Sequence, residues 1–344
     1  MIKKLLATSA LVSTLALTNV SFAQTTITGS LDLTLRNTGV SAGGLSETTM
    51  GRETQINIAN KGKLNNGLDY AAGFSLEFDG QNDNTTINSD SNENVYINLI
   101  SGGTTFFVGV DHIQNSQNDL LNAVGDIQDE VGQGTVSGIL LDTTGFRSPK
   151  EDIGAGIYHN FGNGIVASGL YTPNNTNTGT ANNGAANLST TGTNSAYELG
   201  IRGTNVANSG ISFDLWKNEI EKVTPATLRN QEGLGYSANY NQGPFGIGAS
   251  RIKSERAAAA TELKSTLAHV TYAVDKNLSA SLVYAKTDDT AATSTADEKI
   301  KSLMVGYNFG PVGLLVTASK IDDIGGISAN GDVDALGISL NTRF

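Results

Sequence analysis

The sequence contains no cysteine, which excludes disulfide bonds, thiol catalysis and cysteine-based zinc sites. Only three histidines occur, His112, His159 and His269, and they lie far apart along the chain. Proline is also rare, and its five copies lie in glycine-rich, asparagine-rich or charged stretches, outside every alternating segment. These absences leave few residues from which a conventional catalytic or metal site could be built.

Basic residues are outnumbered by acidic ones, 22 against 33, and the net charge of −11 argues against nucleic acid as a partner. Long apolar runs are missing after the first residues, since no later stretch approaches the ~20 apolar residues of a membrane-spanning helix. The chain begins with Lys3 and Lys4, an apolar stretch and a small-x-small site ending at Ala23. This pattern predicts a cleaved signal peptide over residues 1–23. Removing it from the 344 residues leaves one domain of 321, residues 24–344, whose net charge is −13 because two lysines are lost.

Glycine is abundant, at 40 residues, and much of the chain alternates between apolar and polar residues. In the last segment Leu336, Ile338 and Leu340 alternate with small polar residues, and the chain stops at Phe344. Alternation with period two predicts a strand with one apolar and one polar face. In a closed barrel in lipid, the apolar face looks outward and the polar face lines a lumen. This segment is similar to the closing strand of bacterial outer-membrane proteins, which implies an assembly signal at Ile338, Leu340 and Phe344.

Sixteen segments alternate in this way, joined by seven short turns and eight longer loops, the first of them expected over residues 37–51. Residues 240–246 and 307–313 share the pattern Y-N-x-G-P-x-G, and residues 158–164 are a looser copy. Each copy places an aromatic residue at a strand end, as a membrane aromatic girdle requires. The predicted fold is all-β, a 16-stranded antiparallel transmembrane β-barrel. A large soluble β-sandwich would leave the aromatic residues beside the turns unexplained.

Residues 51–58 and 62–68 resemble the second strand and first turn of the general Gram-negative porins, and the hairpin rhythm extends that resemblance over the mature chain. The resemblance implies an integral outer-membrane protein that is a homotrimer in contact with lipid and lipopolysaccharide. It also implies a general diffusion porin, through which ions and small hydrophilic solutes permeate passively.

The alternation stops for 41 residues between Asp111 and Glu151. A connection of that length is usually functional. Inside it, apolar residues recur at helical spacing, at Leu120, Val124, Ile127 and Val131. The porin resemblance implies that this third external loop, residues 111–151, folds into the lumen and narrows it. The alternative is a loop packed over the mouth or against a neighbouring subunit.

Porin constrictions set loop carboxylates against basic residues of the wall, and rings of charged side chains govern ion selectivity. The candidates on the loop are Asp119, Asp126, Asp129, Glu130 and Asp142, with Arg147 as an internal partner. The candidates on the wall are Arg36, Arg52 and Arg202. For each of them a solvated rim charge is the alternative. The acidic mature chain predicts a weak preference for cations.

Other functions are weighed against this one. The three histidines have no serine or aspartate arranged as a catalytic triad, so an enzyme is disfavoured. A substrate-specific outer-membrane channel is the main alternative, although it would need more lumenal lysine and arginine, and an adhesin would need no wide lumen. No cofactor is expected. The acidic loops 79–90 and 322–334 could hold Ca²⁺, but their spacing matches no EF-hand, and solvated turn acids are favoured.

Overall fold

The structure is a computed structural model. It describes residues 24–40, 45–81, 93–109, 153–175, 194–220, 231–255, 262–290, 295–323, 328 and 331–344. The predicted signal peptide, residues 1–23, and the predicted constricting loop, residues 111–151, lie outside the described residues.

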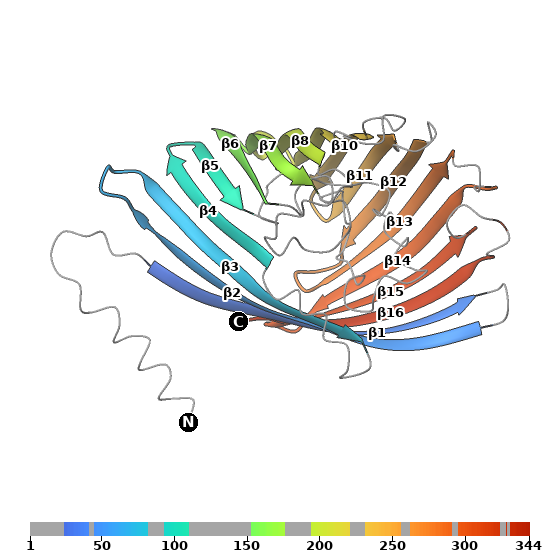
Figure 1. Cartoon of the computed structure of the whole chain (residues 1–344). Coiled ribbons are helices and arrows are strands. Elements are labelled where there is room, and N and C mark those ends of the chain that lie inside the picture. Colours follow the sequence, from blue (N-terminus) through green and yellow to red (C-terminus); the bar gives the residue numbers. More distant parts are fainter. Residues whose placement is uncertain are drawn as a thin grey trace, which may run out of the picture.

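Sixteen antiparallel strands form one closed barrel, in which consecutive strands pair and β1 pairs with β16 (Figure 1). The first eight strands are β1 (Gln24–Val40), β2 (Leu45–Lys63), β3 (Asp69–Gln81), β4 (Glu93–Ser101), β5 (Thr104–Gly109), β6 (Gly154–Gly162), β7 (Ile165–Asn175) and β8 (Asn194–Gly203). The second eight are β9 (Ile211–Ile220), β10 (Gln231–Gln242), β11 (Phe245–Glu255), β12 (Glu262–Ala273), β13 (Leu278–Asp289), β14 (Glu298–Asn308), β15 (Val312–Asp322) and β16 (Val333–Arg343). The predicted strand number and antiparallel closure are confirmed.

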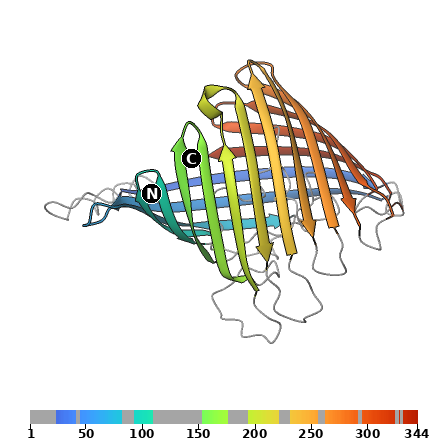
Figure 2. The same ribbon diagram turned by 90° about the horizontal axis from the view of Figure 1, so that it is seen from above.

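From β2 onward, short and long connections alternate along the chain, so the short turns gather at one end of the barrel (Figure 2). We call this the turn end and the opposite end the loop end. In outer-membrane barrels, short turns face the periplasm and longer loops face the outside. The connection from β8 to β9 contains a short 3-10 helix, Val206–Asn208. No helix within the described residues has the length and apolar character needed to cross a membrane.

Side chains alternate between the inside and the outside of the barrel. On β16, Val333 and Ala335 are buried, whereas Leu336 and Leu340 are 45% and 44% exposed. Residues directly opposite each other in neighbouring strands share a face of the sheet. The continuous register therefore carries this assignment around the barrel. Large apolar side chains lie exposed on the outer face, as a lipid-facing surface requires.

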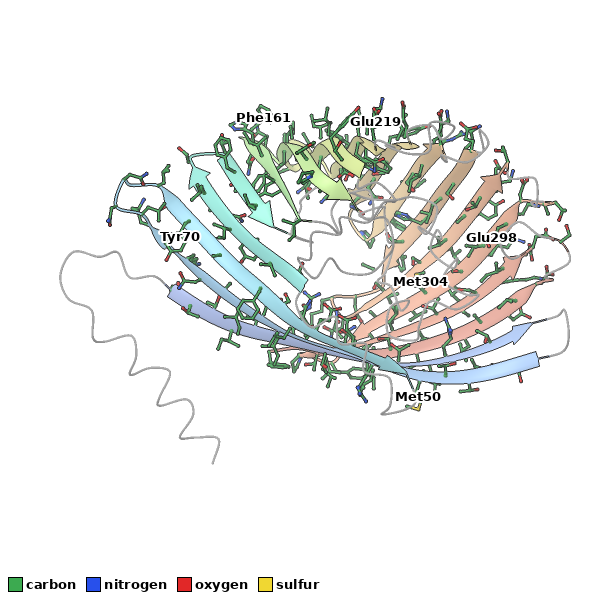
Figure 3. All side chains as sticks on the ribbon, in the orientation of Figure 1. Met50, Tyr70, Phe161, Glu219, Glu298 and Met304 are labelled. Atoms are coloured by element: carbon green, nitrogen blue, oxygen red, sulfur yellow. The ribbon has the colours of Figure 1, made fainter. Side chains whose placement is uncertain are left out.

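Aromatic side chains lie beside the turns, as the repeat predicts. Phe245 and Tyr272 pack with ring centroids 4.8 Å apart, and Tyr307 packs edge-on against Phe309 at 4.6 Å. Phe161 lies near the end of β6, beside the β6–β7 turn, and is 62% exposed (Figure 3). These residues belong to the outward face at the turn end, where a lower aromatic girdle is expected.

The first expected loop, residues 37–51, is largely strand. β1 runs to Val40 and β2 begins at Leu45, and Asn37 donates its side-chain N–H to the Thr48 hydroxyl across the pair at 2.7 Å. Polar Asn, Thr and Ser pairs carry this hairpin beyond the apolar band. The alternation in hydropathy fades there although the backbone pairing continues.

The seam between β1 and β16 is completed by the last residue. The Phe344 N–H donates to the Gly29 carbonyl at 2.9 Å, and the Gly29 N–H donates to the Phe344 carbonyl at 2.7 Å. A β-carbon built on Gly29 would lie 2.5 Å from the Phe344 ring. The absence of a side chain at Gly29 is what lets the ring lie across β1.

Candidate channel lining

The inner face of β2 and β3 carries a chain of hydrogen-bonded polar side chains. The Ser75 hydroxyl donates to the Asn57 side-chain oxygen at 2.5 Å, and the Asn57 amide donates to the Gln55 oxygen at 3.1 Å. The Gln55 amide in turn donates to the Glu77 carboxylate at 2.7 Å. Each partner fixes the next, so this wall presents ordered polar groups to the lumen.

Arg36 lies on the inner face, as its alternation predicts. It stands opposite Thr49 of β2 and Gly337 of β16, and it is 9% exposed. Asp32 shares the same inward row of β1, and Arg343 follows on β16 opposite Ser30. The β1–β16 seam therefore brings charges of both signs to the inner wall.

Arg202 also faces inward, and it is neutralised by an acid on the neighbouring strand that was not among the predicted site residues. Its Nε and Nη2 atoms both donate to one carboxylate oxygen of Asp214, at 3.0 and 2.8 Å. The two residues are directly opposite in β8 and β9, close to the turn end. Arg202 therefore belongs to a paired cluster near the turn-end mouth.

The prediction for Arg52 is wrong. The register places Arg52 opposite Leu33, whose side chain is 46% exposed on the outer face. The inward positions of this part of β2 are Glu53 and Gln55, opposite Asp32 and Ser30. A shift of one residue along a strand moves the side chain to the other face. The charged side chain that β2 places on the inner face here is therefore the acid Glu53 and not Arg52.

The single tryptophan lies on the inner wall between two glycines. Trp216 stands directly opposite Gly200 of β8 and Gly235 of β10, and it is 1% exposed. A β-carbon on Gly235 would lie 2.1 Å from the indole Cε2 atom. The indole can occupy this position because its cross-strand neighbours have no side chains.

The inner wall from β11 to β16 is almost free of charge. Its hydroxyl groups pair across strands, Ser302 with Ser319 at 2.7 Å and Ser265 with Thr287 at 2.6 Å. Its apolar side chains are buried, among them Met304, labelled in Figure 3. The others are Ile252, Leu267, Val283, Ala285, Ile300, Leu315, Ile321, Val333 and Ala335. The described strands therefore place most lumenal charge on β1–β3 and on β8–β9.

The acidic candidates of the long loop, together with Arg147, lie outside the described residues. Several charged inward residues of the strands were not proposed from the sequence, namely Asp32, Glu53, Glu77, Glu198, Asp214 and Arg343. Period-two alternation alone would have placed each of them on the polar face. No group of three or more His, Asp or Glu side chains within the described strands and turns could hold a metal ion.

Comparison with known proteins identifies the architecture. The fold is similar to that of an anion-selective porin from Comamonas acidovorans, with a TM-score of 0.68 at 15% identity, covering 94% of this chain and 100% of that one. A triple mutant of Rhodopseudomonas blastica porin gives 0.61 at 12% identity, covering 93% and 100%. Pseudomonas putida OprB gives 0.64 at 10% identity, covering 94% of each chain. A sequence search of curated proteins gives no significant match. The profile of the Gram-negative porin family matches residues 7–326, and the chain therefore belongs to the Gram-negative porins of the outer membrane.

Proposed function

We propose that this porin is a passive diffusion channel for ions and small hydrophilic solutes with a preference for cations. The observation that carries the preference is the excess of acids on the inward rows of the described strands. The acids there are Asp32, Glu53, Asp69, Glu77, Glu198, Asp214 and Glu298. The bases are Arg36, Lys61, Lys63, Arg202 and Arg343.

Charges that line a water-filled lumen act on ions within about 10 Å, the screening length at 0.1 M salt. Two of the bases are paired with acids of the wall, Arg202 with Asp214 and Lys63 with Asp69, both at 2.8 Å. Glu53 and Glu77 lie on the inner face of the neighbouring strands β2 and β3. Their carboxylates favour cations over anions in the lumen. The carboxylates of the long loop from Asp119 to Asp142 add to this preference in our proposal.

Reversal potentials in planar bilayers under a KCl gradient test the preference. The wild type should be cation-selective, and neutralising the inward acids with Glu53→Gln and Glu77→Gln should lower the ratio of cation to anion permeability. The matched control neutralises two acids of the outer face, Glu232→Gln and Asp334→Asn, and should leave the ratio unchanged. Anion selectivity of the wild type would refute the proposal, as would an equal shift in both variants.

We also propose a homotrimer. The outward rows of β1–β8 carry one charged residue within the described strands, Arg52. A largely apolar half of the outer surface with a single described charge is suited to contact between subunits. Light scattering of the detergent-solubilised protein should give three chains per particle, and a monomer would contradict the proposal.

A further inference from the structure

A polar pocket lies at the turn end of the barrel, between the β8–β9 and β10–β11 turns. Its volume of about 600 Å³ lies within the ~300–1,000 Å³ range of small-molecule sites. The described residues that line it are uncharged, and side-chain amides are frequent among them. Among its lining residues are Asn205, Asn208, Ser212, Tyr240, Asn241 and Gln242. We call this pocket the amide pocket.

Hydrogen bonds hold the β8–β9 turn in one shape around this pocket. The Asn205 N–H donates to the Ser212 hydroxyl at 2.9 Å, and the Asn205 side-chain oxygen accepts from the Gly210 N–H at 2.9 Å. The Asn241 N–H donates to the Gly210 carbonyl at 2.9 Å, which ties the turn to β10. Three of the six described non-glycine residues with positive φ lie in this turn, namely Asn205, Ala207 and Asn208. Backbone strain of this kind concentrates at binding and catalytic sites.

The amide side chains of the pocket keep hydrogen-bonding capacity for a ligand. Asn208, Asn241 and Gln242 are exposed, and none of their amide groups is used in a hydrogen bond within the described strands and turns. Each amide presents a carbonyl oxygen beside two N–H donors, so it can engage two neighbouring hydroxyl groups at once. The pocket therefore combines a fixed backbone with unused donors and acceptors.

The pocket continues onto the inner wall of the barrel. Ser212 stands opposite Asn239, which stands opposite Gly248. Gly248 stands opposite His269, which in turn stands opposite Val283 of the inner wall. A β-carbon on Gly248 would clash with the Asn239 amide oxygen and would lie 2.7 Å from His269 Cε1, so both side chains lie over this glycine.

Asn239 and His269 each have an unpaired polar atom at this place. The Asn239 Oδ1 and His269 Nδ1 atoms are buried and have no hydrogen-bond partner in the described part of the chain, and His269 is 4% exposed. Leaving such atoms unpaired is unfavourable. One ligand hydroxyl can satisfy both, because it donates to the amide oxygen and accepts from the imidazole in its Nδ1–H tautomer.

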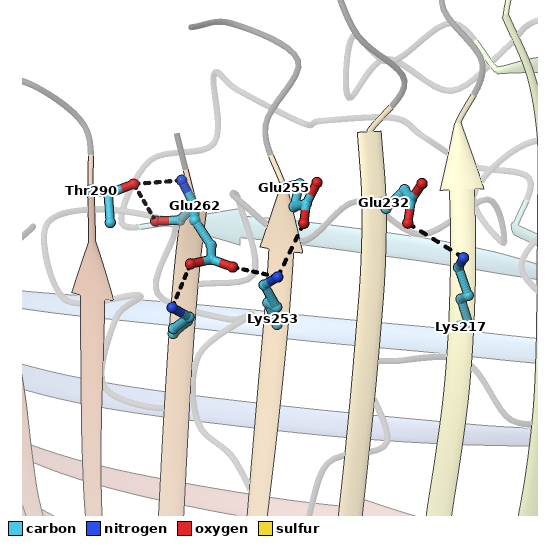
Figure 4. Close-up of polar contacts among 7 residues, drawn as sticks. Lys217, Glu232, Lys253, Glu255, Glu262 and Thr290 are labelled. Atoms are coloured by element: carbon cyan, nitrogen blue, oxygen red, sulfur yellow. Dashed lines mark hydrogen bonds and ion pairs between the residues drawn. The ribbon is translucent and has the colours of Figure 1, made fainter. Parts of the chain in front are cut away.

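The surroundings of the pocket carry no formal charge over three stretches of the chain. Residues 203–213, 233–250 and 265–274 contain no Asp, Glu, Lys or Arg. Arg202 and Asp214, which flank the first stretch, neutralise each other. The loop end differs, since Lys217 there forms an ion pair with Glu232 at 3.3 Å (Figure 4). An ion that entered an uncharged pocket would lose hydration without gaining a counter-charge, so the ligand should be neutral and rich in hydroxyl groups.

Tyr240 adds an aromatic ring at the rim of the pocket. The residue is 42% exposed, and a β-carbon on Gly210 would lie 3.5 Å from its Cε2 atom. A sugar ring has an apolar face of C–H groups and a rim of hydroxyls, which match an aromatic ring beside amide groups. An extended peptide would instead need a free strand edge, and β9 and β10 are paired on both sides.

We propose that the amide pocket, with Asn239 and His269 at its inner end, is a binding site for neutral saccharides in transit through the channel. This inference rests on the proposed channel function and names one class of its solutes. Hydroxyls of a saccharide with two or more rings bind the amides of Asn208, Asn241 and Asn239, and one ring lies against Tyr240. Short turns face the periplasm in outer-membrane barrels, so the site holds the sugar at the mouth through which it leaves. Sugar flux should therefore saturate with concentration.

The test measures how maltotriose lowers the ion current of the purified channel in planar bilayers in KCl. The conductance of the wild type should fall with added maltotriose in a saturable manner. Asn208→Gly combined with Asn241→Ala removes two amides, and glycine tolerates the φ of 61° at position 208. The loss of about one hydrogen bond at each position should raise the half-maximal concentration on the order of tenfold. Tyr240→Leu keeps an apolar side chain in the aromatic girdle and should raise it roughly threefold.

The matched controls make the same changes away from the pocket. Asn94→Gly combined with Asn308→Ala replaces one asparagine of positive φ and the asparagine of the second Y-N-x-G-P-x-G copy, and Tyr307→Leu replaces the tyrosine of that copy. All three control substitutions should leave the maltotriose effect as in the wild type. Polyethylene glycol of the same mass has no hydroxyl groups along its chain, so it should lower the conductance equally in every variant.

Equal maltotriose effects in the pocket variants and their controls would overturn the proposal, as would a wild-type current without saturable block. Retention of the wild type on peptidoglycan sacculi without any block by maltotriose would also overturn it, because the pocket would then hold cell-wall glycan and not a solute in transit. No substitution changes a charge, so the cation preference should be the same in every variant. An ion current without a sugar effect therefore refutes this inference alone, whereas failure to conduct refutes the channel proposal.

Discussion

The packing of Trp216 against Gly235 gives a sharp prediction, because the chain has one tryptophan and its fluorescence reports on one place. Gly235→Ala puts a methyl group where the indole now lies. The new carbon would be 2.1 Å from Cε2, whereas ordinary contact begins at 3.4 Å, so the ring must move by about 1.3 Å. Forcing extra atoms into a packed site costs about 1–3 kcal/mol. The indole should be displaced toward the lumen.

The assay is the emission spectrum in detergent, with acrylamide quenching and a urea unfolding curve. Gly235→Ala should shift the emission to the red, increase quenching and lower the unfolding midpoint. Gly39→Ala is the matched control, since a β-carbon there meets nothing within 4 Å. If the two variants gave the same spectrum and the same midpoint, the assigned packing of the indole would be incorrect.

Two further predictions concern the seam and the outer charges. Gly29→Ala should slow conversion to the heat-resistant folded form on gels, because the added carbon meets the Phe344 ring. It should also lower the stability of the folded form by about 1 kcal/mol. The same folding rate and stability as in Gly39→Ala would contradict this. The hydrogen bond from Lys286 and a second one with Asp288 lower the pKa of Asp297. A lowered carboxyl pKa gives stability that is present above the unfolded value of about 3.9 and is lost as the pH falls through the folded value. The free energy of unfolding of the wild type, measured by thermal unfolding, should therefore fall more between pH 6 and pH 3 than that of Asp297→Asn. The difference should be under about 1 kcal/mol because the ion pair is exposed. An identical pH dependence would refute the role of this pair.

Much of the barrel follows from period-two hydropathy, because a lipid-facing and a water-facing surface impose opposite demands on alternate residues. The strand number, the antiparallel closure and the aromatic residues at the turns were predicted in this way, as was the inward orientation of Arg36 and Arg202. The apolar–polar alternation is absent between Asn37 and Gly51, because polar side chains pair there in water beyond the apolar band. The sequence therefore did not predict these strand extensions.

The identity of the cross-strand neighbours cannot be predicted from the local sequence pattern. Asp214 neutralises Arg202 from the next strand, and the sequence alone does not give the register that places them opposite. The error at Arg52 has a different origin, since its own alternation with Ile56 and Ile58 already placed it on the outer face. Lys253 and Lys264 likewise stand directly opposite each other on the outer face of β11 and β12, a pairing that depends on the register between the two strands.

The pairing of β1 with β16 has a consequence for biogenesis. It joins partners as distant as Ser30 and Arg343, so it is a contact of extreme sequence separation and its loop-closure entropy favours late formation. Until it forms, both strands present unsatisfied backbone groups, which invite aggregation. A folding intermediate would therefore be prone to aggregate through its two unpaired edge strands. The chain would depend on a periplasmic chaperone until its N-terminal and C-terminal strands pair.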